Sequence, residues 1–413
     1  MRAYLQCLLG TAIGTLLLAV GINRLVDPYR IFVEPSILAA DQPAQIAPDD
    51  RLRRTIQVVR YRWQAIILGT SRAELGLDPN HPLFAGRKCM NAATLSQPNE
   101  ETGRLFAAAT EHGTLEQAVL GLDFFAANAQ LAYPLDLDWG NFKPERAWQL
   151  CASLDTFAKS LAALDRRGER TPPPRESFTP RAMALRSEKS YLMGGAYLPP
   201  PSYSYTFSSA QRHPIEAIRQ VIAVAHARHI DLRLFISPSH ARQWEVVAAA
   251  GLWTTWEDWK RQLVAINEEE ARKASQAPFP LYDFSGYNSI TTEPFPLLAD
   301  PAPMRWYLES SHYSRRTGDL VLDRLAGRSP SGRTVPNDFG VLLTHQTIEA
   351  DLAHIRAARM VWRVGHPGDV AEIEQVRREA AAWREQSRAE ASGEVGTGHS
   401  QDGLPSGWAP PSP

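Results

Sequence analysis

Cysteine is scarce in this chain of 413 residues, which contains only Cys7, Cys89 and Cys151. The sequence has no CxxC pair and no Cys/His cluster with zinc-ligand spacing, which excludes the common structural zinc sites. If the chain is exported, Cys89 and Cys151 could pair, although a sequence alone does not test the geometry that a disulfide requires.

An excess of charge of one sign is also missing. The 44 basic and 45 acidic residues give a net charge of −1. A nucleic-acid-binding protein is expected to carry a basic stripe, so nucleic acid is excluded as a partner. Hydrophobic residues make up 44% of the chain, and its length suffices for one large domain with appendages.

Long hydrophobic runs are limited to residues 4–22, which carry no charge and have about the 20 residues that cross a bilayer. We expect a transmembrane anchor over residues 1–23, with a cleaved signal peptide or a buried core helix as alternatives. The flanking charges hardly decide the orientation. Because a first span so near the N-terminus usually exports the C-terminal part of a chain, we expect a single-pass protein of the cell inner membrane. Its bulk would lie on the extracytoplasmic, periplasmic side, while a cytoplasmic-facing enzyme stays open.

After a linker at 24–54, short apolar runs alternate with helical patterns. Residue Asn99 is the expected cap of one of the helices. The predicted strands are 64–68, 88–91, 117–122, 230–237 and 281–284, and the predicted helices are 100–112, 214–229, 257–273 and 317–325. This alternation predicts an α/β domain over 55–328, with a mainly parallel sheet and helices on both faces.

The segment 130–213 breaks this pattern and is rich in proline, arginine and tyrosine. It is an insertion that either shapes a substrate site or forms a variable surface loop. Residues 329–391 are predicted to form a helical extension packed on the outside. The Gly/Ser/Pro-rich tail at 392–413 is predicted to be disordered.

A serine motif, Gly69-Thr70-Ser71, directly follows the first predicted strand. Ligands of open α/β sheets bind beyond the carboxyl ends of the strands, so Ser71 is a candidate nucleophile. Gly69 would permit a sharp turn, and a helix starting at Ser71 would help to stabilise an oxyanion. The same residues also fit a capping box with Glu74, in which Ser71 only caps a helix.

A candidate base lies far along the chain. Glu309 and His312 are three residues apart, so the carboxylate could hold the imidazole in the tautomer that accepts the serine proton. His312 could equally be a surface residue at a helix entry. His240, just beyond another strand, is a pocket or loop residue, with the loop favoured. Asp283 is the rival of Glu309 as the acid.

These motifs resemble those of the SGNH hydrolase superfamily, the GDSL-type esterases and their acyltransferase relatives. The one-span plan is similar to that of its membrane-anchored envelope members. The resemblance covers about residues 55–328 and rests on four blocks in order: Gly69-Thr70-Ser71, residues 91–96, Gly121-Leu122-Asp123 and residues 309–312.

The resemblance implies a three-layer α/β/α domain with a flavodoxin-like, mainly parallel sheet. It also implies Ser71, His312 and Glu309 as catalytic residues and Ser96, Asn91 and Asp123 as oxyanion or substrate residues. No metal or nucleotide cofactor is implied.

Three positions depart from the family pattern. Asp123 stands where an oxyanion-hole asparagine is usual, Ser96 where a glycine is usual, and Glu309 where an aspartate is usual. An ionised carboxylate would repel an oxyanion. Asn128 or Asn91 could substitute for the missing amide.

The expected function is a serine esterase or O-acyltransferase that acts on an envelope glycan or lipid-linked substrate through an acyl-enzyme on Ser71. The alternative, which Asp123 favours, is a non-catalytic scaffold or glycan-binding protein in envelope assembly. Eleven tryptophans and twelve tyrosines could supply surfaces that stack on sugars in that alternative.

Overall fold

The structure is a computed structural model of the whole chain. It describes residues 1–32, 50–129, 143, 145–165, 179–193, 196–197, 203, 214–300, 302–327 and 332–392. Most of the predicted linker, parts of the predicted insertion and the predicted tail beyond residue 392 lie outside the described residues.

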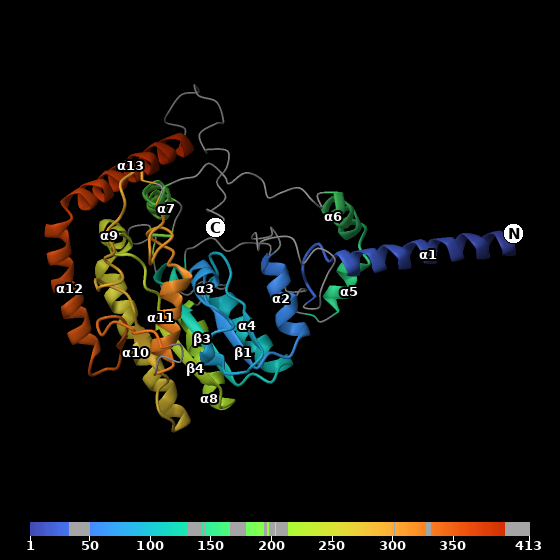
Figure 1. Cartoon of the computed structure of the whole chain (residues 1–413), viewed down its shortest axis with the longest axis horizontal. Helices are drawn as coiled ribbons and strands as arrows, with labels where there is room; N and C mark the ends of the chain where they lie inside the picture. Colours follow the sequence, from blue (N-terminus) through green and yellow to red (C-terminus); the bar gives the residue numbers. More distant parts are fainter. Residues whose placement is uncertain are drawn as a thin grey trace.

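A mostly parallel sheet forms the centre of the described chain (Figure 1). The strand order is β2-β1-β3-β4-β5-β6; the first five are parallel and β6 is antiparallel to β5. Their bounds are β1 Ala65–Leu68, β2 Cys89–Asn91, β3 Gln117–Leu122, β4 Asp231–Ile236, β5 Leu281–Asp283 and β6 Val341–Leu342. The predicted mainly parallel α/β sheet is confirmed, and the C-terminal extension supplies its edge strand in addition to helices.

Helices cover both faces of this sheet because its central strands are apolar on both sides. Ile66 and Leu68 of β1 belong to one core cluster, whereas Ala65 and Ile67 belong to another. The first cluster includes residues of α4 (Asn99–His112), α8 (Pro214–Ala227) and α10 (Trp253–Ala274). The second includes residues of α3 (Ser71–Gly76) and α11 (Arg315–Leu325).

The C-terminal helices α12 (Ile348–Gly365) and α13 (Pro367–Ser392) pack against this domain. Helix α13 lies against α7 (Pro180–Met193) and α9 (Ala241–Ala249). The buried side chain of Arg242 joins these helices, because it pairs with Glu188 of α7 at 2.7 Å and with Asp369 of α13 at 2.6 Å. The extension is therefore tied to the domain by a buried ionic network.

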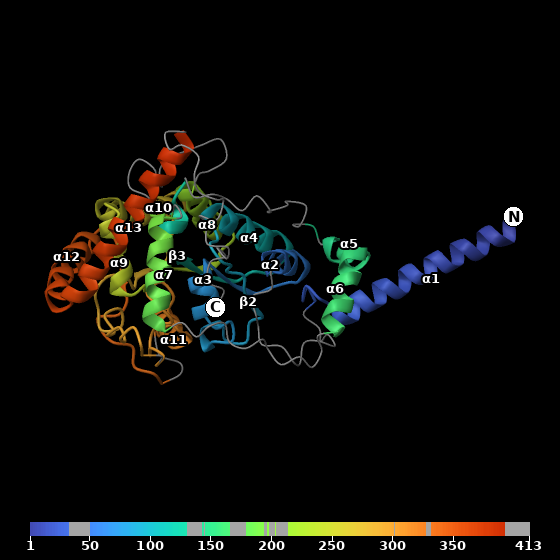
Figure 2. The same cartoon turned by 90° about the horizontal axis from the view of Figure 1, so that it is seen from above.

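Helix α1 (Arg2–Val26) projects away from the rest of the molecule, as both views show (Figures 1 and 2). It ends at Asp27, which has a left-handed backbone (φ 46°) and accepts the N–H groups of Ile31 and Phe32 at 2.9 Å each. Within the described residues, α1 is the helix long and apolar enough to cross a membrane, and a signal sequence would have the same property.

Smaller helices complete the structure. Helices α5 (Arg146–Cys151) and α6 (Leu154–Asp165) lie beside the C-terminal end of α1 (Figure 2), and α2 (Asp50–Arg60) packs on α4. Two short 3₁₀ helices, η1 (Pro82–Phe84) and η2 (Phe124–Ala127), follow α3 and β3.

One local prediction is wrong, and one pairing that the sequence left open does not form. The N-cap of α4 is Pro98, and the Asn99 side chain instead donates to the Pro214 carbonyl at 3.2 Å. Cys89 and Cys151 are both free thiols. Cys89 lies in the edge strand β2, whereas Cys151 packs in a separate apolar cluster beside α1, so the fold keeps them in different environments.

Candidate active site

Ser71 is the first residue of α3 and follows the carboxyl end of β1 after two residues. The N-cap of α3 is Thr70, whose hydroxyl accepts the backbone N–H of Arg72 at 3.3 Å. The capping-box interpretation of Ser71 is therefore wrong. Glu74, the other member of that box, pairs with Arg54 at 2.6 Å. The Ser71 hydroxyl remains available for another partner.

The turn before Ser71 requires a glycine. Gly69 has φ 142°, a conformation that residues with a side chain rarely adopt. A Cβ at this position would also lie 2.9 Å from the Cβ of Ala73 and 3.1 Å from the carbonyl oxygen of Gly121. Gly69 therefore lets the chain turn from β1 into α3 against β3.

The partner of Ser71 is His312. The Ser71 Oγ atom lies 2.8 Å from His312 Nε2, across 241 positions of the sequence. His312 Nδ1 bonds the Oε1 atom of Glu309. A proton on Nδ1 leaves Nε2 free to accept the serine proton. The structure thus brings together the three residues that the sequence pointed to as nucleophile, base and orienting acid.

A tight loop holds the base in place. Tyr307 and Tyr313 form an isolated antiparallel bridge, and the Leu308 N–H donates to the His312 carbonyl at 2.9 Å. The buried Tyr307 hydroxyl donates to the Pro238 carbonyl, beyond the end of β4, at 2.7 Å. These bonds tie the loop to the carboxyl ends of the strands, where Ser71 also lies.

The Glu309 carboxylate is held in its ionised form. It is buried and accepts the backbone N–H groups of Ser311 and His312 at 2.9 Å each. Burial by itself raises the pKa of Glu309, but the attraction and hydrogen bonding of His312 and these N–H groups outweigh it, so the pKa lies below its usual value. An ionised Glu309 can stabilise the positive imidazolium that forms when His312 takes a proton.

Asp123 lies in a buried ion pair next to the serine. Its Oδ1 accepts from the Arg72 guanidinium at 2.8 Å, and its Oδ2 accepts from the Thr70 hydroxyl at 2.6 Å. Burial lowers the pKa of Arg72, but nearby groups, Asp123 among them, outweigh this and place it well above its usual value. Both carboxylate oxygens of Asp123 thus hold residues that flank Ser71, which is a different role from the oxyanion or substrate contact expected from the sequence.

Sequence reasoning missed the residues that complete this network. The Arg72 guanidinium also donates to the Ser311 hydroxyl at 3.2 and 3.3 Å, and the Tyr191 hydroxyl lies 2.9 Å from that of Ser311. Arg72 neighbours the nucleophile and Ser311 neighbours the base, so the network connects the two segments. Only the adjacency of Arg72 and Ser311 to the site was visible in the sequence, because Tyr191 belongs to the predicted insertion.

The other oxyanion candidates, Asn91, Ser96 and Asn128, each have a different structural setting. The Asn91 amide donates to the carbonyls of Ala73, Glu74 and Leu77 at 3.0, 3.3 and 3.1 Å, so it supports the end of α3. Ser96 has a left-handed backbone with φ 50°, the conformation that glycine favours. Asn128 is buried after η2.

The rival residues belong to other parts of the core. His240 caps α9, and its Nε2 lies 2.7 Å from the Glu293 carbonyl. Burial lowers the pKa of His240 to about 3, so it is neutral. Asp283 forms an ion pair with the buried Lys260. The carboxylate that contacts His312 is Glu309.

No known family model matches this chain, and neither the curated proteins nor the solved structures give a significant match.

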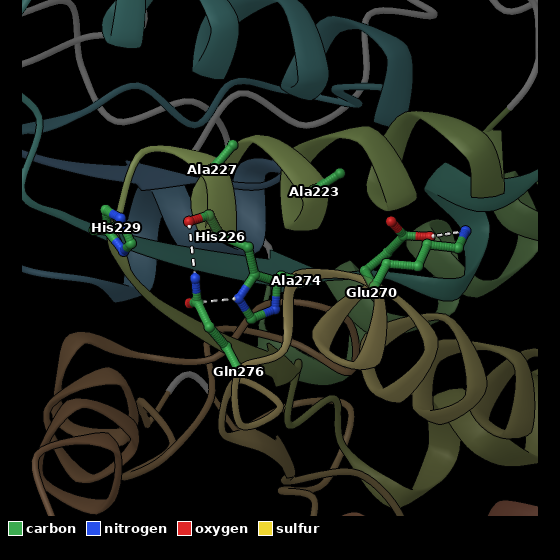
Figure 3. A pocket seen from close by; sticks show the side chains of 8 residues that line it. Ala223, His226, Ala227, His229, Glu270, Ala274 and Gln276 are labelled. Atoms are coloured by element: carbon green, nitrogen blue, oxygen red, sulfur yellow. Dashed lines mark hydrogen bonds and ion pairs between the residues drawn. The ribbon is translucent and has the colours of Figure 1, made fainter.

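A pocket near the amino ends of the parallel strands is separate from this site, which lies at their carboxyl ends (Figure 3). It lies between the C-terminal ends of α8 and α10, next to the starts of β4 and β5. His226 lines it and bonds Gln276 through Nδ1 at 3.0 Å. No hydrogen-bond partner for His226 Nε2 occurs in the described part of the chain. Ser71 and His312 do not line this pocket.

Proposed function

We propose that this chain is a membrane-anchored serine esterase or O-acyltransferase that acts on an envelope glycan or lipid-linked substrate. The observation that carries the proposal is the hydrogen-bonded series of Ser71, His312 and Glu309. This series joins a nucleophile, a base and an orienting acid, an arrangement that recurs in acyl-transfer enzymes on unrelated folds.

In the proposed reaction, the Ser71 oxygen attacks the carbonyl carbon of an ester while His312 Nε2 takes the hydroxyl proton. The tetrahedral intermediate then expels the alcohol, which receives that proton from His312, and an acyl-serine remains. The ionised Glu309 stabilises the imidazolium during both proton transfers. The loop that contains Ser96 lies next to the turn before Ser71, since the Thr94 N–H donates to the Gly69 carbonyl at 3.3 Å. Backbone N–H groups at the start of α3 and in this loop are therefore candidates to bind the oxyanion.

The second half of the reaction decides between the two activities. His312 removes a proton from water or from a sugar hydroxyl, whose oxygen attacks the acyl-serine and releases Ser71. Water makes the chain an esterase, and a sugar hydroxyl makes it a transferase. Both outcomes use the same three residues.

The strand order supports placing the chain with the SGNH hydrolases as part of this proposal. The order β2-β1-β3-β4-β5 of the parallel strands is that of flavodoxin-like sheets, whose ligands bind at the carboxyl ends of the strands. The serine after β1 and the Glu-x-x-His segment between β5 and α11 both lie at that edge. The left-handed φ of Ser96 also fits a position where the family usually has glycine.

The argument for a non-catalytic scaffold loses its main premise in this geometry. That argument rests on repulsion between Asp123 and an oxyanion. Both carboxylate oxygens of Asp123 are occupied by Arg72 and Thr70, and the negative charge is paired.

Labelling with a fluorophosphonate tests the proposal. The reagent phosphonylates an activated serine, so the wild-type chain should be labelled and Ser71→Ala should not. Glu309→Gln should slow labelling by a factor on the order of 10²–10⁴, because a neutral amide no longer stabilises the imidazolium or fixes its tautomer. Ser289→Ala, an exposed serine bound to Asp338, is the matched control and should label as the wild type does. Equal labelling of the wild type and Ser71→Ala, or none in either, would contradict the proposal.

A further inference from the structure

One face of helix α6 exposes large apolar side chains, while another face buries polar ones. Leu154 is 77% exposed and Leu161 is 49% exposed, although both are large aliphatic residues. Thr156 and Ser160, four residues apart on another face, are buried. Leu154, Ala158 and Leu161 follow the i, i+4, i+7 spacing of one helix face, and all three are exposed. A helix on the surface of a soluble protein normally has the reverse arrangement.

A hydrogen bond to α1 accounts for the burial of Ser160. The Ser160 hydroxyl donates to the side-chain oxygen of the buried Asn23 of α1 at 2.9 Å. Asn23 also donates to the Cys151 carbonyl at 2.8 Å and to the Ser153 carbonyl at 3.2 Å, which ties the segment between α5 and α6 to α1. Because Ser160 faces α1, the leucines on another face of α6 point outward.

The exposed leucines belong to a helix that packs on α1. Helix α6 lies beside α1 near its C-terminal end (Figure 2). Exposed aliphatic side chains of α1 include those from Leu5 to Leu18. Helix α6 is thus next to the segment that could cross a bilayer, at the point where the chain would leave it.

Aromatic and basic residues at this junction are typical of a membrane interface. Trp148 of α5 is 51% exposed, with its ring 5.7 Å from that of Phe32. Arg24 lies over the Phe32 ring at 4.1 Å, and Lys159 lies over the Tyr29 ring at 4.5 Å. Tryptophan and basic side chains are enriched where a transmembrane helix emerges from lipid.

We propose that α5 and α6 lie in the bilayer surface, with Leu154, Leu161 and Trp148 inserted at the boundary between headgroups and acyl chains. The occupant of this apolar face is lipid, because α6 packs on α1 where that helix would leave the bilayer, and because interfacial residue types surround the junction. This inference rests on the proposed membrane anchor. The hydrogen bonds of Asn23 make α1, α5 and α6 one unit, so insertion of the pair would set how the domain is oriented to the membrane.

Site-specific fluorescence tests the proposal in the full chain reconstituted into nanodiscs of phosphatidylethanolamine and phosphatidylglycerol. Cys7→Ser and Cys89→Ala remove the accessible thiols, and an environment-sensitive NBD probe is attached at Leu161→Cys. Leu17→Cys in α1 is the positive control, and Arg228→Cys, exposed just after α8, is the negative control.

The expected result is blue-shifted emission from the probe at position 161. Lipids that carry a spin label near the headgroup should quench this emission. A spin label at the end of the acyl chain should quench the probe less, because an interfacial helix is shallow. At position 17 a probe should be quenched by both lipids, and at position 228 by neither.

Quenching at position 17 with solvent-like emission at 161 would overturn the interfacial role while leaving the anchor. A blue shift at 161 without lipid quenching would indicate a protein contact and would also overturn it. Absence of quenching at 17 would remove the anchor and this inference together. Fluorophosphonate labelling of Ser71 in the same samples reports on the proposed chemistry independently.

Discussion

Ser71 and Arg72 are consecutive in the chain, but their side chains belong to two different hydrogen-bond networks. Ser71 contacts the His312 and Glu309 series, whereas Arg72 contacts Asp123 and Ser311. The two networks meet again at Ser311 and His312, which are also consecutive. Two side-by-side contacts thus hold the nucleophile and base segments together. The contact of Ser71 with His312 serves the chemistry, and the contact of Arg72 with Ser311 fixes the position.

The substitution Asp123→Asn should destabilise the protein by about 3–5 kcal/mol, because it leaves the buried Arg72 guanidinium without its compensating charge. Urea unfolding in detergent, followed by circular dichroism, measures this loss. The double variant Arg72→Gln with Asp123→Asn should be less destabilised than Asp123→Asn alone. An unfolding midpoint of Asp123→Asn equal to that of the wild type would show that the pair is not the main support of this turn.

Helices α3 and α11 make the closest contact among the elements of the site. A Cβ at Gly318 of α11 would lie 1.7 Å from the carbonyl oxygen of Gly76 in α3, so the two backbones touch directly. Helix α3 begins with Ser71, and α11 begins three residues after His312. The separation of these two helices therefore sets the distance between the nucleophile and the base.

The substitution Gly318→Ala should force α11 away from α3. We expect a loss of stability of about 1–3 kcal/mol from overpacking, together with slower fluorophosphonate labelling of Ser71. Gly368→Ala in α13 is the control, since no atom lies within 4 Å of its added Cβ, and it should be neutral or slightly stabilising. Labelling of Gly318→Ala at the wild-type rate would mean that the loop holds His312 without help from α11.

The contact between α12 and α10 contains a further buried charge cluster. Lys260 of α10 pairs with Asp283 of β5 and lies 3.2 Å from Asp351 of α12. One cation thus faces two carboxylates. Burial and then the charge of Asp283 raise the pKa of Asp351 to about 7. Since this value lies above the usual pKa of an aspartate, the folded state binds a proton that the unfolded state releases.

The stability contributed by Asp351 is fully present below about pH 4, the unfolded pKa, and is lost as the pH rises to about 7. Asp351→Asn should therefore flatten the pH dependence of unfolding over this window, by up to a few kcal/mol at about 1.4 kcal/mol per pKa unit. Urea midpoints at about pH 5 and about pH 8 measure the slope. Asp258→Asn, on the exposed surface, should keep the wild-type profile. An unchanged slope in Asp351→Asn would argue that Asp351 is ionised throughout.

The whole molecule consists of an α/β domain with an apolar helix that is exposed for most of its length and anchored only at its end. Residues of α1 up to Leu18 are exposed, whereas Asn23 is buried against α5 and α6, and Phe32 belongs to an apolar cluster with residues of α5. The boundary between the exposed apolar segment and the folded unit therefore falls inside α1.

Deletion of residues 2–18 should convert the protein from a form that resists carbonate extraction to one that carbonate releases, with Ser71 labelling retained. Deletion of residues 2–32 should also lower the unfolding temperature, because it removes Asn23 and Phe32 from their partners. Sedimentation after carbonate treatment and thermal unfolding measure the two effects. Release of the full-length chain by carbonate would contradict an uncleaved anchor.

A topology reporter tests the orientation on the same scale. A reporter that is active only in the periplasm should be active when it is fused after position 390. Activity of a reporter that works only in the cytoplasm, fused at the same position, would reverse the predicted localisation.

Local patterns predicted the five parallel strands and helices α4, α8, α10 and α11, but not α2, α9 or β6. The apolar runs that became β1 and β3 are buried at every position, and such runs are readable without knowledge of their neighbours. The proline, glycine and polar residues between them marked most of the helix ends. Where a cap depends on distant groups, as with Asn99 and the Pro214 carbonyl, the local pattern failed.

The sequence by itself determined a long apolar segment near the N-terminus, an alternating α/β pattern and the residue types of the site, because each depends on short-range order along the chain. Tertiary structure alone decided that Ser71 meets His312, that Asp123 pairs with Arg72, that Cys89 and Cys151 stay apart, and that α6 turns its leucines outward. These are contacts between segments separated by tens to hundreds of positions, and only the packing of helices on the sheet selects which of them form.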